Sequence, residues 1–206
     1  MPTVAWETAE GRRYALDGGV YNAGSAIAWL RSIGLFADYG EIDGFEGPSM
    51  LERGLVFVPA LSGLAAPYWD RSAAGLFLGL GLETTRGDLM RAALEGVALR
   101  AAQVLDRMAE ATALKSPLSV DGGLSVNRFF LEMLATATGL AIAVPAIAEL
   151  TGYGVGLFAL LGAGLAHRIE ALPPCRRQRL VEPGPRLDKA HRDRFADAVE
   201  RARSWR

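Results

Sequence analysis

The residues best suited to binding a ligand lie in the segment Val120–Asn127, which reads Val-Asp-Gly-Gly-Leu-Ser-Val-Asn. A predicted strand ends there in two adjacent glycines, and a helical pattern begins directly after them. Glycine leaves the backbone open to anionic groups, and a helix N-terminus offers free N–H groups and a partial positive charge. The Gly122–Gly123 turn therefore predicts a site for a phosphate or nucleotide. A tight turn that needs a positive φ, with Asp121 or Ser125 capping the helix, explains the same residues without a ligand.

A second candidate is Gly24, which falls inside a helix predicted over residues 20–35. A glycine in a helix interior costs about 1 kcal/mol relative to alanine, so its presence needs a compensating contact. Close packing against another helix and close approach of a ligand both satisfy that need. The segment Thr151–Gly156 opens a further predicted helix with three glycines and leaves the same two alternatives.

The remaining residue types offer no recognisable chemistry. His167 and His191 are far apart and lack the spacing of metal ligands, so we expect both on the surface or in packing contacts. The sequence contains neither a Gly-x-Ser-x-Gly nucleophile motif nor a phosphate-binding loop with its lysine. Cys175 is the only cysteine and has no internal disulfide partner, and the N-terminus shows no secretory signal pattern. These features predict a cytoplasmic protein.

Composition limits the class of protein further. The chain has 206 residues, of which 50% are hydrophobic and 22% charged, and we expect one globular domain spanning residues 1–206. Its net charge of -1 gives no field that would attract nucleic acid or an anionic membrane. The arginines after Pro173 alternate with acidic residues and are expected on a solvated face. The apolar stretch Val155–Ala166 is too short for a membrane span of about 20 residues and is expected to form a buried helix.

Hydrophobic periodicity predicts strands that alternate with helices, which favours an α/β domain with parallel pairing. The clearest element is a helix with Thr85 or Gly87 at its N-cap. Tyr68 and Trp69, in a loop between two strands, are expected to pack back on the sheet. The expected strands cover residues 4–6, 14–16, 55–60, 75–80, 118–120 and 141–144, and the expected helices cover residues 20–35, 88–111, 125–138, 154–166 and 188–205.

The most specific motif runs from Gly75 to Glu95. It begins with Gly-x-Phe-x-Gly-Leu and continues, after seven intervening residues, with Asp-Leu-x-x-Ala-Ala-Leu-Glu. This arrangement resembles the signature of the FGGY carbohydrate kinases, in their C-terminal domain. Leu64–Asp70 resembles the Gly-Leu-Gly-Ala-Pro-Tyr-Trp-Asp segment of the glycerol kinases within that family. Ala23–Arg31 and Val120–Asn127 resemble two further family segments, so the resemblance spans nearly the whole chain.

The resemblance implies the actin-like ATPase fold, a ribonuclease-H-like α/β domain with a mixed sheet flanked by helices. It also implies ATP with Mg²⁺ as the cofactor, bound through Gly24, Gly123 and Asn127, with Gly122 in the same turn. In the family, the γ-phosphate of ATP passes to a polyol or sugar hydroxyl, and the acceptor site and general base lie in an N-terminal domain. The chain shows no counterpart of that domain, so we expect it to be inactive alone. Its expected partners are ATP or ADP and either the missing N-terminal half or a second copy held by the same docking surface.

Two departures from the family pattern affect the nucleotide site. The resemblance places a glutamine where this chain has Ala28, and the segment Glu149–Gly154 replaces a Thr-Ala-Leu-Gly run. Loss of the glutamine removes a polar contact of about 1 kcal/mol. An alternative function is therefore a non-catalytic binding or interaction module that uses the former domain interface.

Overall fold

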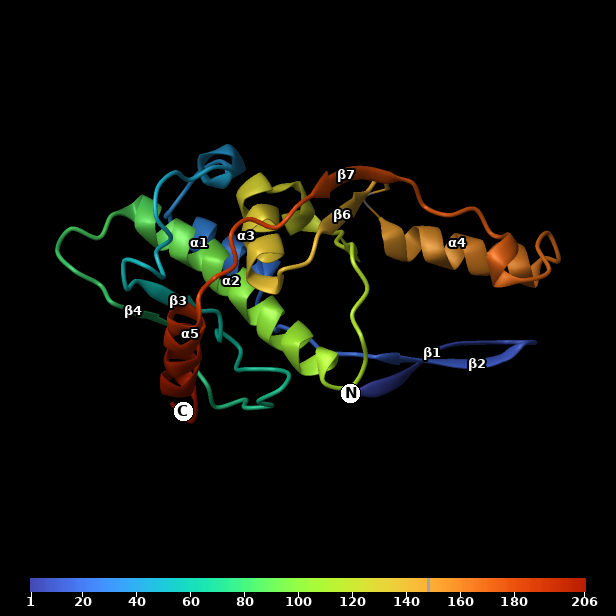
Figure 1. Ribbon diagram of the computed structural model, residues 1–206, viewed down its shortest axis with the longest axis horizontal. Helices are drawn as coiled ribbons and strands as arrows, with labels where there is room; N and C mark the ends of the chain where they lie inside the picture. Colours follow the sequence, from blue (N-terminus) through green and yellow to red (C-terminus); the bar gives the residue numbers. More distant parts are fainter. Residues whose placement is uncertain (148) are drawn as a thin grey trace.

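A computed structural model describes residues 1–147 and 149–206, and one long helix, α2 (Arg86–Ala109), runs through its centre (Figure 1). The N-cap of α2 is Thr85, one of the two residues that the sequence left as candidates. The Thr85 hydroxyl accepts a hydrogen bond from the backbone N–H of Asp88, and the Asp88 carboxylate accepts one from the N–H of Thr85. This reciprocal capping satisfies two N–H groups that a helix start otherwise leaves unpaired.

The strands form three small sheets, and the third sheet is mixed because β5 and β6 are parallel while β6 and β7 are antiparallel. The first two sheets are antiparallel pairs, and the first of them is the hairpin expected near the N-terminus. The strands are β1 (Pro2–Thr8) with β2 (Gly11–Leu16), β3 (Val56–Val58) with β4 (Leu76–Leu78), and β5 (Leu118–Ser119) with β6 (Ile142–Pro145) and β7 (Arg177–Val181).

Helices pack against β3, β6 and β7, and two of the helices begin later than the sequence pattern suggests. The first begins at Gly24 and not at residue 20, so Gly24 is its first residue and the interior penalty does not arise. The third begins after Asn127, because a short 3₁₀ turn precedes it. The remaining α-helices are α1 (Gly24–Ser32), α3 (Arg128–Thr138), α4 (Leu150–Gly162) and α5 (Lys189–Ala202), and the 3₁₀ turns are η1 (Tyr39–Ile42), η2 (Gly123–Val126) and η3 (Ile169–Ala171).

The core lies where α2 meets β3, α1 and α3, with α5 packed on β3. Helix and strand approach closely because Gly96 of α2 faces β3: a Cβ at that position would lie 2.1 Å from the carbonyl oxygen of Phe57. The side chains of Phe57 and Leu94 are fully buried nearby in the same cluster. The glycine therefore sets the distance between the two elements.

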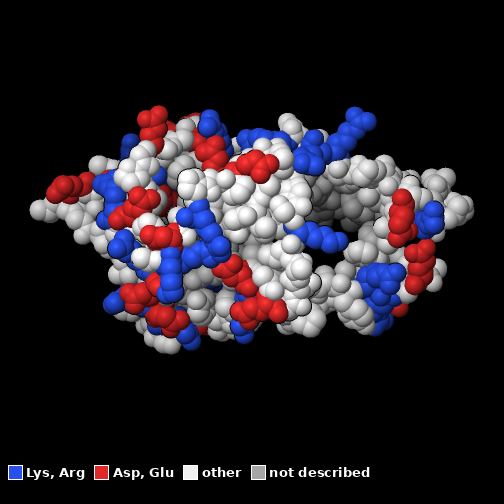
Figure 2. Space-filling model, viewed as in Figure 1, with Lys and Arg blue, Asp and Glu red and all other residues white. Residues whose placement is uncertain are grey.

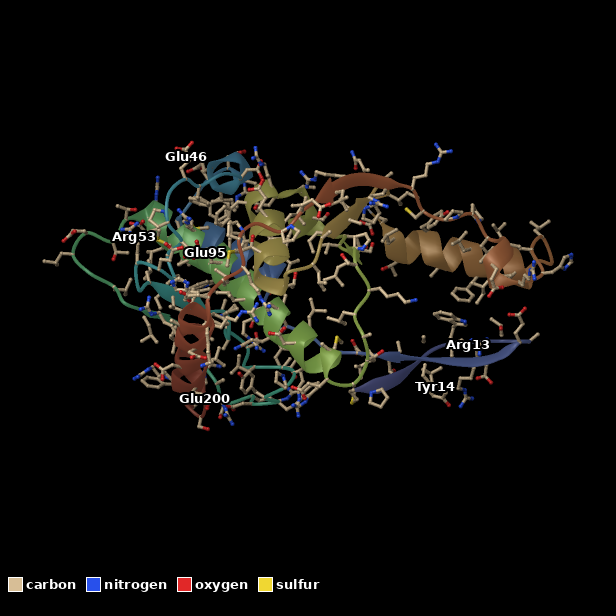
Figure 3. All side chains as sticks on the ribbon, in the orientation of Figure 1. Arg13, Tyr14, Glu46, Arg53, Glu95 and Glu200 are labelled. Atoms are coloured by element: carbon tan, nitrogen blue, oxygen red, sulfur yellow. The ribbon has the colours of Figure 1, made fainter. Side chains whose placement is uncertain are left out.

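A buried ion pair joins α2 to the segment before β3. The carboxylate of Glu95 accepts hydrogen bonds from Arg91 at 2.8 Å and from the backbone N–H of Met50 at 2.9 Å. Arg91 in turn donates to the backbone carbonyls of Glu46 and Gly47. Burial raises the pKa of the Glu95 carboxyl, and its hydrogen bonds to Arg91 oppose that rise. Figure 3 labels Glu46 and Glu95 where this segment passes α2.

Helix α4 contradicts the prediction of a buried apolar helix, since none of its residues is buried. It extends away from the core beside the β1–β2 hairpin (Figure 1), which it touches through the rings of Trp6 and Phe158, 5.9 Å apart. Val155 is 66% exposed. Because the sequence of α4 is apolar, we expect another element to pack over it, but none of the described elements does so. Among the described residues, no helix has both the length and the apolarity needed to cross a membrane.

Polar and aromatic surface residues follow the sequence predictions in part. Figure 2 shows acidic and basic side chains interspersed over the face it presents, as the near-zero net charge suggests. Tyr68 packs against the core between the guanidinium groups of Arg100 and Arg203, whereas its neighbour Trp69 is 55% exposed. The expectation that both aromatic rings pack on the sheet is therefore wrong for Trp69.

Candidate functional site

The turn after β5 has the geometry that two glycines predict, with one correction. The positive φ lies at Gly122, at +86°, and Gly123 has no such requirement. The hydroxyl of Ser125 donates to the carbonyl of Gly122 at 2.7 Å, which closes the turn. Neither Asp121 nor Ser125 caps the following helix, so that part of the prediction is wrong.

Asn127 is the N-cap of α3 and is buried. Its Oδ1 accepts from the backbone N–H of Phe130 at 2.7 Å, and its Nδ2 donates to the carbonyl of Ile42 at 2.7 Å. The backbone N–H of Arg128 also donates to the carboxylate of Asp43 at 2.6 Å. These bonds hold the segment that follows α1 against the start of α3. An amide still has one further N–H and one further lone pair, so Asn127 retains capacity for a ligand.

Replacing Asn127 by alanine is expected to lower the free energy of unfolding by about 1–2 kcal/mol, because it removes a helix cap and leaves the Ile42 carbonyl unpaired. Urea unfolding followed by circular dichroism measures this loss. Asn127→Ser is the matched control: its hydroxyl can accept from the N–H of Phe130 as a helix cap but is too short to replace the donor to Ile42, so it should retain part of the stability. An alanine variant as stable as the parent would show that the cap contributes nothing.

Gly24 and Gly123 are both exposed, and a Cβ at either position would meet no atom within 4 Å. Close helix packing therefore does not explain Gly24. The N-terminus of α1 carries no side-chain cap; it is positioned by Asn22, which accepts from the N–H of Ser62 at 2.8 Å and donates to Ser25 at 3.3 Å. Both glycines offer unobstructed backbone to a ligand.

A cavity of about 470 Å³ opens at the carboxyl ends of the parallel strands β5 and β6. Asp121 and Ser125 line it from the glycine turn, and Arg179 lines it from β7. Arg179 also donates to the carbonyl of Ser125 at 3.0 Å. In open α/β sheets, ligands bind in the crevice outside the carboxyl ends of the strands. Arg179 was expected on a solvated face, and its place beside the turn appears only once β7 pairs with β6.

The structure thus brings together part of the predicted site. Gly122, Gly123 and Asn127 lie along one stretch of chain, next to the cavity that Asp121 lines, although those three residues do not line it themselves. Gly24 lies on another helix, α1. The segment that follows α1 is held to the start of α3 by the hydrogen bond from Asn127 to the carbonyl of Ile42. The glycines of Thr151–Gly156 fall within the first two turns of exposed α4 and are equally open.

Charged groups near the turn give the site a mixed polarity. Asp121 is exposed and carries a carboxylate, and Arg179 supplies the opposing guanidinium. Ala28, on the exposed side of α1, offers no polar group where the family resemblance places a glutamine. Among residues 1–147 and 149–206, no group of three or more His, Cys, Asp or Glu side chains could hold a metal ion.

The fold identifies the class of protein to which the chain is related. The structure superimposes on Plasmodium falciparum glycerol kinase, solved with ADP, over 98% of this chain, with a TM-score of 0.80 and 26% identity. It matches the fold of xylulose kinase from Lactobacillus acidophilus over 94% of the chain, with a TM-score of 0.71 and 21% identity. These proteins are carbohydrate kinases with the actin-like ATPase fold, and the chain shares that fold.

The sequence comparisons then give the family. Residues 2–163 match the FGGY family of carbohydrate kinases, C-terminal domain, and the chain belongs to that family. It is 39% identical to glycerol kinase from Thermus brockianus and 35% identical to glycerol kinase from Rippkaea orientalis, over 210 residues in each case. Each alignment covers 100% of this chain and 42% of the relative, so the chain spans less than half their length. These relatives are kinases, and they give no support to a non-catalytic module.

Proposed function

We propose that the chain is the ATP-binding C-terminal half of a glycerol-kinase-like enzyme that transfers the γ-phosphate of ATP to a polyol or sugar hydroxyl. The observation that carries this proposal is the exposed Gly122–Gly123 turn, which lies beside a cavity at the carboxyl ends of two parallel strands. The P. falciparum relative of the same fold was solved with ADP. Open backbone at such a turn suits the close approach of a phosphate or a nucleoside.

Each predicted site residue has a distinct part in this proposal. Gly24 offers the uncapped first turn of α1, and Gly123 offers open backbone in the turn after β5. Gly122 shapes the turn through its positive φ. Asn127 fixes α3 against the segment after α1 and presents its remaining hydrogen-bonding capacity to the nucleotide.

The chain fits Mg²⁺ only as a partner of nucleotide phosphates. The described residues contain no cluster of ligands that could form a protein cage for the ion. Mg²⁺ commonly keeps several waters and binds one or two carboxylates together with phosphate oxygens, where it neutralises developing charge during phosphoryl transfer. We assign no residue of this chain to the ion, which the nucleotide phosphates would hold.

We also propose that residues 1–206 act as a single domain whose missing partner is the sugar-binding half of the kinase. The relatives are more than twice as long as the chain, and no motif in this sequence supplies an acceptor site or a general base. Cys175 is a free thiol, which suits the reducing cytoplasm as the place where the enzyme works. Chemistry would then require closure of both halves on ATP and acceptor.

Gly123→Val is expected to abolish ATP binding, because a β-branched side chain would occupy the open space above the turn. Calorimetric titration with MgATP measures this; the parent chain should bind weakly, since the other wall of the cleft is absent. Gly81→Val is the matched control, since Gly81 is also exposed, has open space around it and lies in a loop outside the site. Unchanged affinity in folded Gly123→Val, or submicromolar affinity in the parent, would contradict the proposal.

The free chain is expected to associate with itself, because α4 and the hairpin expose apolar surface that a partner half would cover. Sedimentation velocity over a range of concentrations would detect the larger species. Val155→Lys adds a charge at an apolar position of α4 that is 66% exposed and should reduce association, whereas Thr151→Lys, at an exposed polar position of the same helix, should not. A monodisperse monomer at high concentration would count against this expectation.

A further inference from the structure

We propose that Arg91 of α2 is a positioning residue for the nucleotide site, where it fixes the orientation of the Asn127 side-chain amide. It acts through the segment Ile42–Gly47, which it binds and which in turn contacts the start of α3. The inference rests on the proposed function in one respect, because it takes Asn127 to contact the nucleotide. The family motif that contains Arg91 leaves its position unspecified.

The orientation of the Asn127 amide matters because the other three predicted site residues are glycines, which have no side chain to donate or accept a hydrogen bond. The backbone N–H of Phe130 needs the amide oxygen, and the carbonyl of Ile42 needs the amide nitrogen, so both bonds together allow a single orientation. The free N–H and the free lone pair of the amide therefore point where the Ile42 carbonyl directs them.

The segment Ile42–Gly47 makes two further contacts with the start of α3. The backbone N–H of Arg128 donates to the carboxylate of Asp43 at 2.6 Å. The rings of Phe45 and Phe129 meet edge to face, with their centroids 4.9 Å apart. Most of the segment is exposed to solvent, so its position depends on these contacts and on those it makes with α2.

Arg91 supplies the contacts from α2 and uses all three nitrogen atoms of its guanidinium. Two of them donate to the carbonyls of Glu46 and Gly47 at 2.6 and 2.9 Å, and Nε donates to the carboxylate of Glu95 at 2.8 Å. The Cζ atom also lies 5.4 Å from the centre of the Phe129 ring, so one side chain contacts both the segment and α3. Figure 3 labels Glu46 and Glu95, which accept from Arg91 through a backbone carbonyl and a carboxylate.

Lysine cannot reproduce this arrangement, because its ammonium is a single point of charge on a flexible stem and not a planar fork. Arg91→Lys therefore keeps a positive charge beside Glu95 and loses the simultaneous hold on the two backbone carbonyls. The Ile42 carbonyl then has no fixed place, and the Asn127 amide loses its direction. We expect the dissociation constant for MgATP to rise about two- to ten-fold, the range that one hydrogen bond accounts for.

The test measures nucleotide affinity and the state of the Asn127 side chain on the full chain. Calorimetric titration with MgATP gives the dissociation constant. Nuclear magnetic resonance with isotopically labelled asparagine reports on the amide directly, because the sequence contains only two asparagines, Asn22 and Asn127. In Arg91→Lys, the side-chain amide signals of Asn127 should shift or broaden, while those of Asn22 should stay as in the parent.

Two control variants separate positioning from loss of stability. Leu99→Ala opens a cavity on the buried side of α2, about two helical turns beyond Arg91, and destabilises the same helix. Arg194→Lys makes the same chemical change elsewhere, because Arg194 donates from α5 to the backbone carbonyls of Leu51 and Glu52. Both controls should retain the affinity and the Asn127 signals of the parent under conditions where every variant is folded.

Weaker binding in Arg91→Lys, together with changed Asn127 signals and absent from both controls, would support the proposal. It would be overturned if Arg91→Lys binds MgATP as the parent does, if the Asn127 signals do not change, or if Leu99→Ala weakens binding as much. Should Arg91→Lys fail to fold, the double variant Arg91→Gln with Glu95→Gln decides by the same measures, because it leaves no buried charge unpaired.

Failure of the proposed function would give a different result. A parent chain that binds no MgATP would reject the nucleotide site itself. The Asn127 signals of the parent and of Arg91→Lys would then decide alone whether Arg91 positions the amide, and unchanged signals would overturn that role.

Discussion

Gly96→Ala is expected to destabilise the chain by about 3 kcal/mol, although alanine is the better helix former. A Cβ at position 96 would lie 2.1 Å from the carbonyl oxygen of Phe57 and 3.1 Å from its carbonyl carbon. Both atoms belong to the backbone of β3, which is buried and pairs with β4, so no side-chain rotation relieves the overlap. The helix and the strand must separate, and the apolar contacts between them are lost.

Gly87→Ala provides the matched control in the same helix. Gly87 lies in the first turn of α2, is exposed, and a Cβ there would meet only the Thr85 hydroxyl, at 3.7 Å. This variant should be more stable than the parent by about 0.5 kcal/mol, because alanine restricts the unfolded chain. Urea unfolding of the parent and the two variants gives both free-energy differences, provided that the unfolding free energy falls with urea concentration at the same slope in all three. Equal stability of Gly96→Ala and Gly87→Ala would mean that α2 and β3 do not approach as the structure shows.

The second large effect concerns catalysis. The purified chain is expected to form no ADP above background in the presence of glycerol and MgATP. General-base assistance contributes a factor of about 10² to 10⁴, and positioning of the acceptor contributes more. We identify no residue in this sequence for either function. A coupled assay for ADP, with and without the missing portion of the T. brockianus relative, measures the difference.

The assay needs a control that distinguishes ADP formation by the two mixed portions from ADP formation by a contaminating kinase. The added portion alone should also be inactive, and Gly123→Val in this chain should abolish the activity of the mixture. Robust phosphorylation of glycerol by this chain alone would overturn its assignment as half of an enzyme. Asp70, Asp88 and Asp121 would then be the carboxylates to examine as a base.

Local patterns predicted the central element well. The sequence left Thr85 and Gly87 as alternatives for its N-cap, and the structure decides for Thr85 through a capping box with Asp88, three residues on. The glycine turn after β5 was likewise predictable, since a positive φ at a strand-to-helix turn favours glycine at one position, which the structure assigns to Gly122. The family signature predicted the whole fold, because a motif of that length and spacing is specific to the family.

Features that depend on distant contacts could not be predicted in the same way. Ser125 and Asn127 are both good capping residues, and only the short 3₁₀ turn before α3 decides in favour of Asn127. Arg179 lines the cavity because β7 pairs with β6, and nothing in its local sequence distinguishes it from the neighbouring arginines. The burial of α4 was predicted from its composition, but burial requires a covering element that composition does not report.

The exposure of α4 also has a consequence for the life of the protein in a cell. The core around α2 is closed within the chain, whereas α4 and the hairpin have few contacts to hold them. Local opening there costs little free energy, so proteases and chaperones will meet this region first while the core stays folded.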